Sequence, residues 1–223
     1  MFHSQFKQDK FLEKKIFKGF KNGFFVDVGA YDGIGINNTL FFEKNHNWKG
    51  INIEANKKVF DKLIINRPNS INLNYAVCNY NGVTDFLCNT GYTELISGIK
   101  ESFDKRHLVR LEKENKEMGS TTKIVKVKTK KLECILDENK ISHINYLSID
   151  VEGGEFEVIK SINFDKVFID VIGFENNYND VSIPIIKYLE DKNFKMIKKY
   201  GIPSADGKLH DIFMINKQSN FNN

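Results

Sequence analysis

A chain of 223 residues, of which 41% are hydrophobic and 28% charged, is long enough to fold as one domain around a single core. A net charge of only +4 does not indicate a nucleic-acid partner, and no apolar run approaches the roughly 20 residues of a membrane-spanning helix. Three cysteines without C-x-x-C spacing argue against a disulfide framework or a zinc site. Because the N-terminus is also unlike a signal peptide, we predict a reduced, cytoplasmic protein without a membrane partner.

The hydrophobic pattern predicts helices that alternate with strands along most of the chain. The predicted helices span residues 4–19, 36–45, 57–66, 131–138, 154–161 and 181–192. The predicted strands span residues 24–28, 49–54, 70–76, 83–88, 144–149, 166–173, 194–199 and 209–215. The connection at residues 201–208 is too short for a crossover helix, so the last two strands should pair antiparallel. The alternation predicts an α/β fold around a mostly parallel sheet.

The pattern is weakest between residues 89 and 120. Residues 101–118 are highly charged, which favours a helix or a mobile lid. We interpret residues 89–120 as a lid-like insertion within a single domain of residues 1–223. The polar and small residues of this insertion that should cover a ligand, in roles left open, are Tyr92, Thr93, Ser97 and Gly98.

Acids and glycines follow the first two predicted strands. Asp27 lies near the end of the first strand, and Gly29 and Gly33 allow the backbone to turn tightly and approach a ligand. Glu54 ends the second strand, where a carboxylate can accept both hydroxyls of an adenosine ribose. The glycine spacing is G-x-x-x-G-x-G rather than G-x-G-x-x-G, which favours an adenosine ligand without a pyrophosphate.

A second acidic group follows the fourth and fifth strands of the predicted main sheet. Asp150 and Glu152 flank one residue, so on an extended chain they point to the same side. Glu155 is interpreted as structural, because an acid stabilises the start of the next helix. Glu175 and Asn176 end the neighbouring strand, so their oxygens and Asp150 are a candidate Mg²⁺ site. A hydrogen-bonded network of acids is the alternative.

Further candidates lie at the two ends of the chain. His210 begins the last strand and is a candidate general base, because imidazole titrates near neutral pH. Ser4, Gln5 and Asp9 belong to the leading helix, which has the right position in the sequence to fold over the ligand. Simple helix capping is the other interpretation of these three residues.

These segments together resemble the FkbM family of S-adenosylmethionine-dependent methyltransferases. The combination of D-V-G-A with I-D-V-E-G-x-E is specific, and the resemblance covers most of the chain outside residues 89–140. Ala55 departs from the relatives, which often have proline there, but Glu54 is present. The matching segments are FFVDVGAYDGIGINNT (24–39), WKGINIEAN (48–56), NYAVCN (74–79), LSIDVEGGEFEVI (147–159), HDIFMIN (210–216) and the leading SQFKQD (4–9).

The resemblance implies a class I methyltransferase fold. Its seven-stranded sheet would have the order 3-2-1-4-5-7-6, with the last strand antiparallel and helices on both faces. Asp150 and Glu152 would face the reacting centre, with His210 as a further catalytic candidate. The residues that would bind S-adenosylmethionine are Asp27, Gly29, Ala30, Tyr31, Gly33, Glu54, Ala55, Ala76, Val77 and Asp150.

Because family members commonly methylate hydroxyls, the sequence predicts O-methylation of a sugar, a nucleotide-sugar or another small metabolite. Three alternatives stay open. The acceptor is an RNA ribose 2′-hydroxyl, for which lysine-rich residues 123–131 are the only support. The chain is a non-catalytic adenosine-ligand binder, which its acids at residues 150, 152 and 175 argue against. It is a nicotinamide oxidoreductase, which the glycine spacing disfavours.

Overall fold

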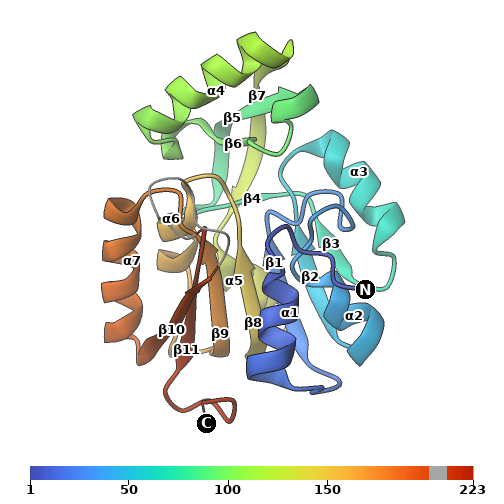
Figure 1. The fold of residues 1–223 in the computed structure, drawn as a ribbon, viewed down its shortest axis with the longest axis vertical. Coiled ribbons are helices and arrows are strands. Elements are labelled where there is room, and N and C mark those ends of the chain that lie inside the picture. Colours follow the sequence, from blue (N-terminus) through green and yellow to red (C-terminus); the bar gives the residue numbers. More distant parts are fainter. Residues whose placement is uncertain (201–209, 223) are drawn as a thin grey trace.

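The computed structural model describes residues 1–200 and 210–222, and its central feature is a seven-stranded sheet (Figure 1). The strands of this sheet are β1 (Phe24–Val28), β2 (Lys49–Ile53), β3 (Ile71–Leu73), β8 (His143–Ile149), β9 (Phe168–Glu175), β10 (Phe194–Tyr200) and β11 (Asp211–Asn216). Their spatial order is β10-β11-β9-β8-β1-β2-β3, and β11 is antiparallel to both of its neighbours. When these seven strands are numbered in chain order and read from the β3 edge, the order is 3-2-1-4-5-7-6.

Helices cover both faces of this sheet, which confirms the α/β class. The α-helices of the described residues are α1 (Gln8–Leu12), α2 (Leu40–His46), α3 (Lys57–Asn66), α4 (Lys105–Met118), α5 (Leu132–Glu138), α6 (Glu155–Lys160) and α7 (Asn179–Asp191), of which α4 lies apart from the main sheet. On one face α5, α6 and α7 pack on residues such as Val26, and on the other α1 and α2 pack on residues such as Phe25. Since Phe25 and Val26 are both fully buried, the strand is covered on both sides and reads as a continuous apolar run.

A second, four-stranded sheet raises the strand count to eleven in the described residues, more than the sequence predicted. Its strands are β4 (Ala76–Val77), β5 (Gly82–Thr90), β6 (Gly98–Ile99) and β7 (Thr121–Lys130), in the order β4-β7-β5-β6. The predicted strand at residues 70–76 is wrong in extent, because β3 ends at Leu73 and the chain then changes sheets. Asn74 causes this break: its side chain donates to the carbonyls of Glu54 and Ala55, 2.7 and 3.1 Å away.

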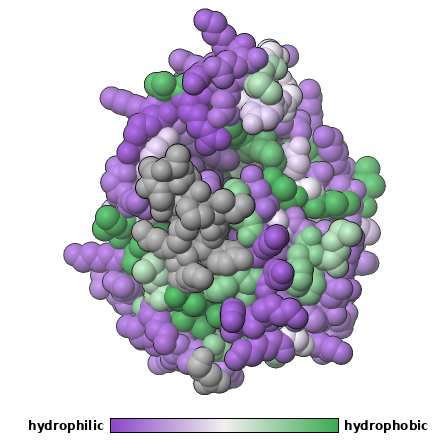
Figure 2. Space-filling model, in the orientation of Figure 1, coloured by the Kyte–Doolittle hydropathy of each residue, from purple (hydrophilic) through white to green (hydrophobic). Residues whose placement is uncertain are grey.

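The region predicted as a lid-like insertion stands over one edge of the main sheet. Residues 89–120 contain the end of β5, two short 3₁₀ turns, β6 and α4, and Figure 1 shows α4 as the outermost element at the top of the molecule. The outer surface of this part is mostly hydrophilic (Figure 2), as its charged sequence predicts. β7 is also largely exposed, including Lys123, Lys126 and Lys128.

The leading helix is shorter than predicted. Helical structure begins at Gln8 rather than residue 4 and consists of α1 followed by a π-helical turn that ends at Phe17. The reason is a local capping arrangement, in which the Asp9 backbone N–H donates to Ser4 Oγ at 2.8 Å and Asp9 Oδ2 accepts from the Ser4 N–H at 3.3 Å. α2 likewise begins at Leu40, four residues later than predicted, because residues 29–39 form the loop described below.

The remaining global predictions can be stated briefly. None of the helices in the described part of the chain has the length and apolar character needed to cross a bilayer. All three cysteines are free. β10 and β11 pair antiparallel as predicted, whereas most of their connection, residues 201–209, lies outside the described residues.

Candidate functional site

A cavity of about 470 Å³ lies between the carboxyl ends of the parallel strands and the second sheet with α4. This volume is within the range of about 300–1,000 Å³ that is typical of small-molecule sites. The predicted residues that do not line it are Gly33 and Asn176, together with Ser4, Asp9 and Thr93. The predicted residues that line it are Asp27, Gly29, Ala30, Tyr31, Glu54, Ala55, Ala76, Val77, Asp150, Glu152, Glu175 and His210, and from the insertion Tyr92, Ser97 and Gly98.

The loop after β1 lies directly against Asp150, the first of the acids that follow β8. Gly29 has a φ of +86°, and a Cβ there would lie 1.8 Å from the carbonyl oxygen of Asp150. The Asp150 N–H in turn donates to the Val28 carbonyl at 2.9 Å. Only glycine allows the ends of β1 and β8 to approach so closely, and this contact is what places Asp150 beside the β1 loop.

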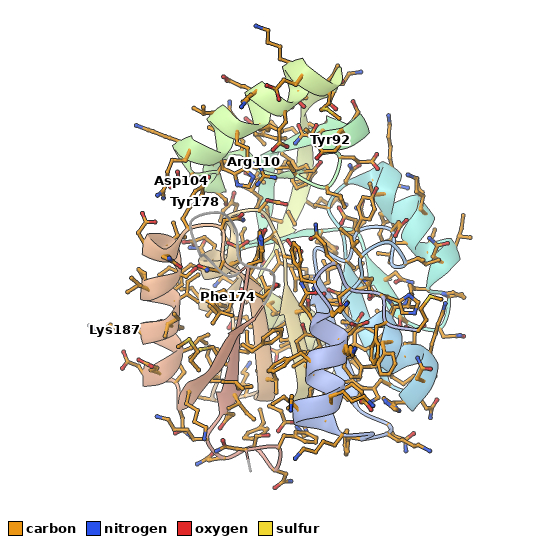
Figure 3. The ribbon with its side chains drawn as sticks, viewed as in Figure 1. Tyr92, Asp104, Arg110, Phe174, Tyr178 and Lys187 are labelled. Carbon is orange, nitrogen blue, oxygen red and sulfur yellow. The ribbon has the colours of Figure 1, made fainter. Side chains whose placement is uncertain are left out.

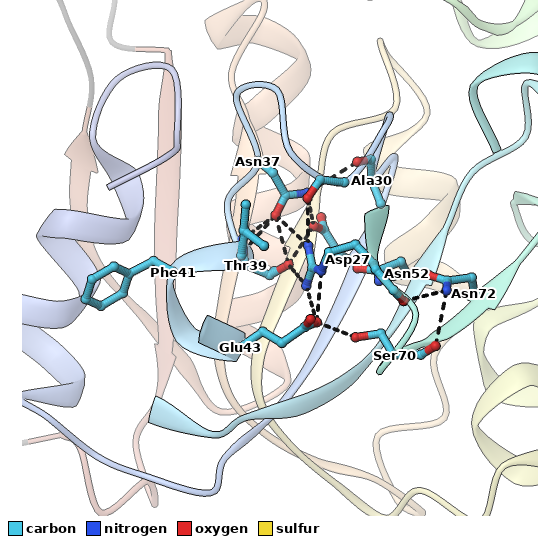
Figure 4. Close-up of polar contacts among 12 residues, drawn as sticks. Asp27, Ala30, Asn37, Thr39, Phe41, Glu43, Asn52, Ser70 and Asn72 are labelled. Atoms are coloured by element: carbon cyan, nitrogen blue, oxygen red, sulfur yellow. Dashed lines mark hydrogen bonds and ion pairs between the residues drawn. The ribbon is translucent and has the colours of Figure 1, made fainter. Parts of the chain in front are cut away.

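Asp27 is more deeply embedded than the sequence suggested. Its Oδ2 accepts from Asn37 Nδ2 and from Thr39 Oγ1, each at 2.9 Å (Figure 4). Burial raises the pKa of Asp27, while the nearby Arg67 guanidinium and these two donors act in the opposite direction. Asp27 therefore holds the loop in shape from beneath and also forms part of the cavity wall.

Gly33 was predicted to bind S-adenosylmethionine, but the structure gives it a packing role instead. Its φ is +78°, and a Cβ there would lie 2.6 Å from both Leu63 Cδ1 and Arg67 Cγ. The glycine is needed because α3 and the residue after it press against the loop at this point. It therefore shapes the cavity floor from outside.

Glu54 is held in the position expected for a ribose-binding acid. Its two carboxylate oxygens accept from the backbone N–H groups of Tyr31 at 3.1 Å and Asn56 at 2.7 Å. Burial raises the pKa of Glu54 to about 7, although these backbone donors lower it. The Tyr31 hydroxyl donates to Glu94 Oε2 at 2.7 Å, so the β1 loop is tied to the insertion above it.

Three carboxylates converge at the other end of the cavity. One oxygen each of Asp150, Glu152 and Glu175 lies within 4.8 Å of the others. Burial, followed by the charges of Glu155 and Asp27, raises the pKa of Asp150 to about 7. Burial and mutual repulsion also raise the pKa values of Glu152 and Glu175. Such a group favours a shared proton, a bound cation or hydroxyl donors.

Asn176 is not part of this acidic group, so the predicted metal set of Asp150, Glu175 and Asn176 is wrong in one member. Asn176 is fully buried, and its Oδ1 accepts from Ser182 Oγ at 2.6 Å in α7. Adjacent residues of a strand point to opposite sides, so Glu175 and Asn176 cannot both face the cavity. Glu152 takes the third place.

Glu155 has the structural role that the sequence predicted. Its Oε1 accepts from the N–H groups of Gly153 at 3.0 Å and Val151 at 3.4 Å. These bonds hold the turn between β8 and α6, in which Glu152 adopts a φ of +58°. The turn in this way directs Glu152 toward the cavity.

The N-terminal segment closes one side of the cavity mouth. Gln5 and Phe6 line the cavity, and the Phe6 ring stacks on the His210 ring with centroids 4.3 Å apart. Gln8 Nε2 donates to Asp211 Oδ2 at 3.0 Å and so fixes α1 against β11. Of the three predicted residues, Gln5 lines the cavity, whereas Ser4 and Asp9 cap each other.

The insertion contributes residues that the sequence did not single out. Arg110 and Glu114 line the cavity from α4, and Figure 3 shows Arg110 beneath this helix. His107, one turn earlier, is buried with its Nε2 3.3 Å from Glu152 Oε2. Thr93 is also buried, but it donates to Asn115 at 2.6 Å and not to the cavity. The buried His107 and Leu111 mark the inner side of α4, a signal that the sequence analysis did not use.

Comparison with family models decides the family. The model of the methyltransferase FkbM domain matches residues 27–196, which include the β1 loop, the acidic group and the whole of the second sheet. The chain belongs to the FkbM methyltransferase family. No curated protein gives a match.

Solved structures agree with this FkbM assignment at the level of the fold. A putative methyltransferase from Streptococcus mutans, solved in complex with SAH, has a TM-score of 0.51 at 9% identity, covering 93% of this chain and 94% of that one. A putative rRNA methylase from Clostridium thermocellum has a TM-score of 0.51 at 7% identity, covering 94% and 95%. Such low identities show a shared class I methyltransferase-like fold and leave the acceptor open.

The residues present fit S-adenosylmethionine, the methyl donor of this family. Gly29 and Ala30 form a cavity wall with little side-chain bulk, and the Glu54 carboxylate borders the cavity at the end of β2. Ala76 and Val77 add a small apolar wall, as the family resemblance implied for the adenine. Family and fold together support S-adenosylmethionine-dependent methyl transfer.

Proposed function

We propose that this protein transfers a methyl group from S-adenosylmethionine to a hydroxyl of a sugar or similar small metabolite, with Asp150 as the general base. The observation that carries the proposal is the position of Asp150. Its side chain opens into the cavity, and its backbone is bonded to the end of β1, where the donor loop begins. A base at that junction can reach an acceptor placed against the donor.

The chain's own residues would act mainly by alignment and proton transfer. When bound, S-adenosylmethionine supplies a methyl group on a positively charged sulfur, and this sulfur leaves as S-adenosylhomocysteine. Asp150 would take the proton of the acceptor hydroxyl while the hydroxyl oxygen of the acceptor forms the new bond to the methyl carbon. Holding the reactants in line can lower the activation free energy by up to roughly 7–11 kcal/mol. Glu152 and Glu175 would orient the acceptor, and His210 stands at the mouth as a second candidate base.

Donor binding gives the first test. Glu54→Gln should weaken the binding of S-adenosylhomocysteine by about tenfold to 100-fold, because it removes a charged hydrogen-bond acceptor for the ribose. Isothermal titration calorimetry measures this affinity, and NAD should give no heat with the unaltered protein.

Asp61→Asn is the matched control, because Asp61 is an exposed acid of α3 paired only with Lys57 and lies outside the cavity. It should bind S-adenosylhomocysteine as the unaltered protein does. Tight binding of NAD, or equal affinity in the Glu54 variant, would contradict the donor site proposed here.

Metal dependence gives the second test. Because a carboxylate base needs no cation, we expect full turnover in EDTA. Asp150, Glu152 and Glu175 are also suitable oxygen ligands for Mg²⁺, which would act by lowering the pKa of the hydroxyl. Activity that is lost in EDTA and restored by Mg²⁺ would replace the general base with this metal mechanism.

RNA is the competing acceptor class, since some proteins of similar fold are RNA methylases by name. The lysine-rich stretch in β7 is the support for this class, but Lys126 is already paired with Asp85 at 2.6 Å. Detectable turnover of any acceptor would also reject the alternative of a non-catalytic adenosine-ligand binder. A cytoplasmic location stays a prediction of the sequence.

A further inference from the structure

We propose that α4 forms the acceptor-binding wall and that the acceptor carries hydroxyl groups but no phosphate or other anionic group. This inference rests on the proposed function, because it concerns the acceptor side of the same cavity. It goes further by excluding nucleotide-sugars and RNA from the substrates.

The first step is that α4 is fixed over the acidic group. Asp104 caps the helix by accepting from the Arg106 N–H at 2.8 Å. The Arg106 side chain then reaches α7, where it pairs with Asp180 at 3.0 Å and lies 3.9 Å above the Tyr178 ring. On the inner side, His107 contacts Glu152. The helix therefore holds one position relative to the three carboxylates.

The charged side chains that line the cavity are mostly acidic. Among the described residues that line the cavity, seven are carboxylic acids and Arg110 is the only lysine or arginine. Arg110 Nε already donates to Glu114 Oε1 at 2.7 Å, so this cation is matched by an acid of its own helix. Among the described lining residues, no lysine or arginine other than Arg110 offsets the charge of Asp150, Glu152 and Glu175. A phosphate placed there meets net repulsion from this acidic group, even where its members share a proton.

The carboxylates and the Arg110 guanidinium are groups that bind hydroxyls well. Carboxylates accept hydrogen bonds from hydroxyls, and a guanidinium has five N–H donors, only one of which the Glu114 contact uses. Tyr92 adds an aromatic ring at the rim that is 63% exposed and can cover the apolar face of a sugar ring. This combination fits an uncharged or amino-bearing polyol.

The test compares matched acceptors with the donor present. The probes are glucose and glucosamine among a panel of neutral and amino sugars, the corresponding sugar phosphates and uridine-diphosphate sugars, and a short RNA. We expect transfer only to neutral or amino sugars, with kcat/KM for phosphorylated counterparts at least about 100-fold lower. Methylation of a phosphate-bearing probe at a comparable rate overturns the proposal.

Binding decides the matter if no probe is methylated. Pyrophosphate and uridine diphosphate are titrated into protein saturated with S-adenosylhomocysteine, with and without Mg²⁺. Absence of binding up to about 1 mM supports the proposal, and tighter binding under either condition overturns it. If S-adenosylhomocysteine itself fails to bind, the proposed function fails, which is a different result.

Variants on the two sides of α4 test whether its cavity-facing side binds the acceptor. Arg110→Gln should raise the KM of a neutral acceptor about tenfold, with little change in donor affinity, because it removes hydrogen bonds from a charged donor. Lys113→Gln removes the same charge from the exposed side of α4 and should change neither value. If both variants leave KM unchanged, α4 is not the acceptor wall.

Discussion

Asp150→Asn should lower turnover by about 10²–10⁴-fold while S-adenosylhomocysteine still binds. Asparagine has nearly the same shape as aspartate, so the backbone contacts of Asp150 with β1 persist and the fold is retained. An amide cannot take the proton of the acceptor hydroxyl, so only the chemical step is impaired. The measurements are donor consumption with a methylatable sugar and calorimetry with S-adenosylhomocysteine.

The pH profile gives this prediction a second readout. Since the pKa of Asp150 is raised to about 7, the proportion of the basic form falls as the pH drops through that value. With the donor kept saturating, so that titration of Glu54 does not limit the rate, we expect kcat/KM for the acceptor to decline below about pH 7 and this decline to be absent from the residual activity of Asp150→Asn. Asp165→Asn, at an exposed position, is the control and should keep full activity. Unchanged turnover in Asp150→Asn would remove Asp150 from the mechanism.

Arg67→Ala should destabilise the protein by about 3–5 kcal/mol. Arg67 is fully buried, and its guanidinium lies 2.7 Å from Glu43 Oε2, with a further bond to the Gly33 carbonyl at 3.1 Å. It also donates to Asn37 and Thr39, the two residues that hold Asp27 (Figure 4). Alanine leaves Glu43 without its countercharge in a half-buried position and opens a cavity. Urea unfolding measures the loss.

The same variant should also weaken donor binding, because the loop between β1 and α2 rests on Arg67. A double variant, Arg67→Met with Glu43→Met, separates charge from packing, since it removes both members of the pair and keeps much of the volume. It should recover part of the lost stability. A loss below about 1 kcal/mol in Arg67→Ala would show that this ion pair does not support the loop.

The cofactor side of the site was largely predictable from sequence, for a physical reason. A buried parallel strand must read as an apolar run, and the change to acid and glycine marks where it ends at a crevice, as at Asp27 and Gly29. The same reasoning found Glu54, Asp150 and Glu175, all of which line the cavity. It erred at Asn176, although strand alternation alone rules out two adjacent residues sharing one face.

The acceptor side was not predictable in this way. Arg110 and Glu114 are two of many charged residues in α4, and although His107 and Leu111 mark the inner side of this helix, only tertiary structure shows which charged residues reach the cavity. Arg67 follows α3 with no local signal, and its partners are between 24 and 34 positions away in the sequence. Gly33 was assigned to the ligand because a positive φ serves close packing and ligand approach equally well.

The bond between Gln8 and Asp211 joins residues 203 positions apart and fixes one wall of the cavity mouth. A growing chain on the ribosome therefore cannot complete its mouth until the segment with β11 has emerged, however early the β1 loop forms. Donor retained by a partly synthesised chain would be open to water on that side. The protein should acquire its full capacity to hold the donor only after the segment with β11 has been synthesised.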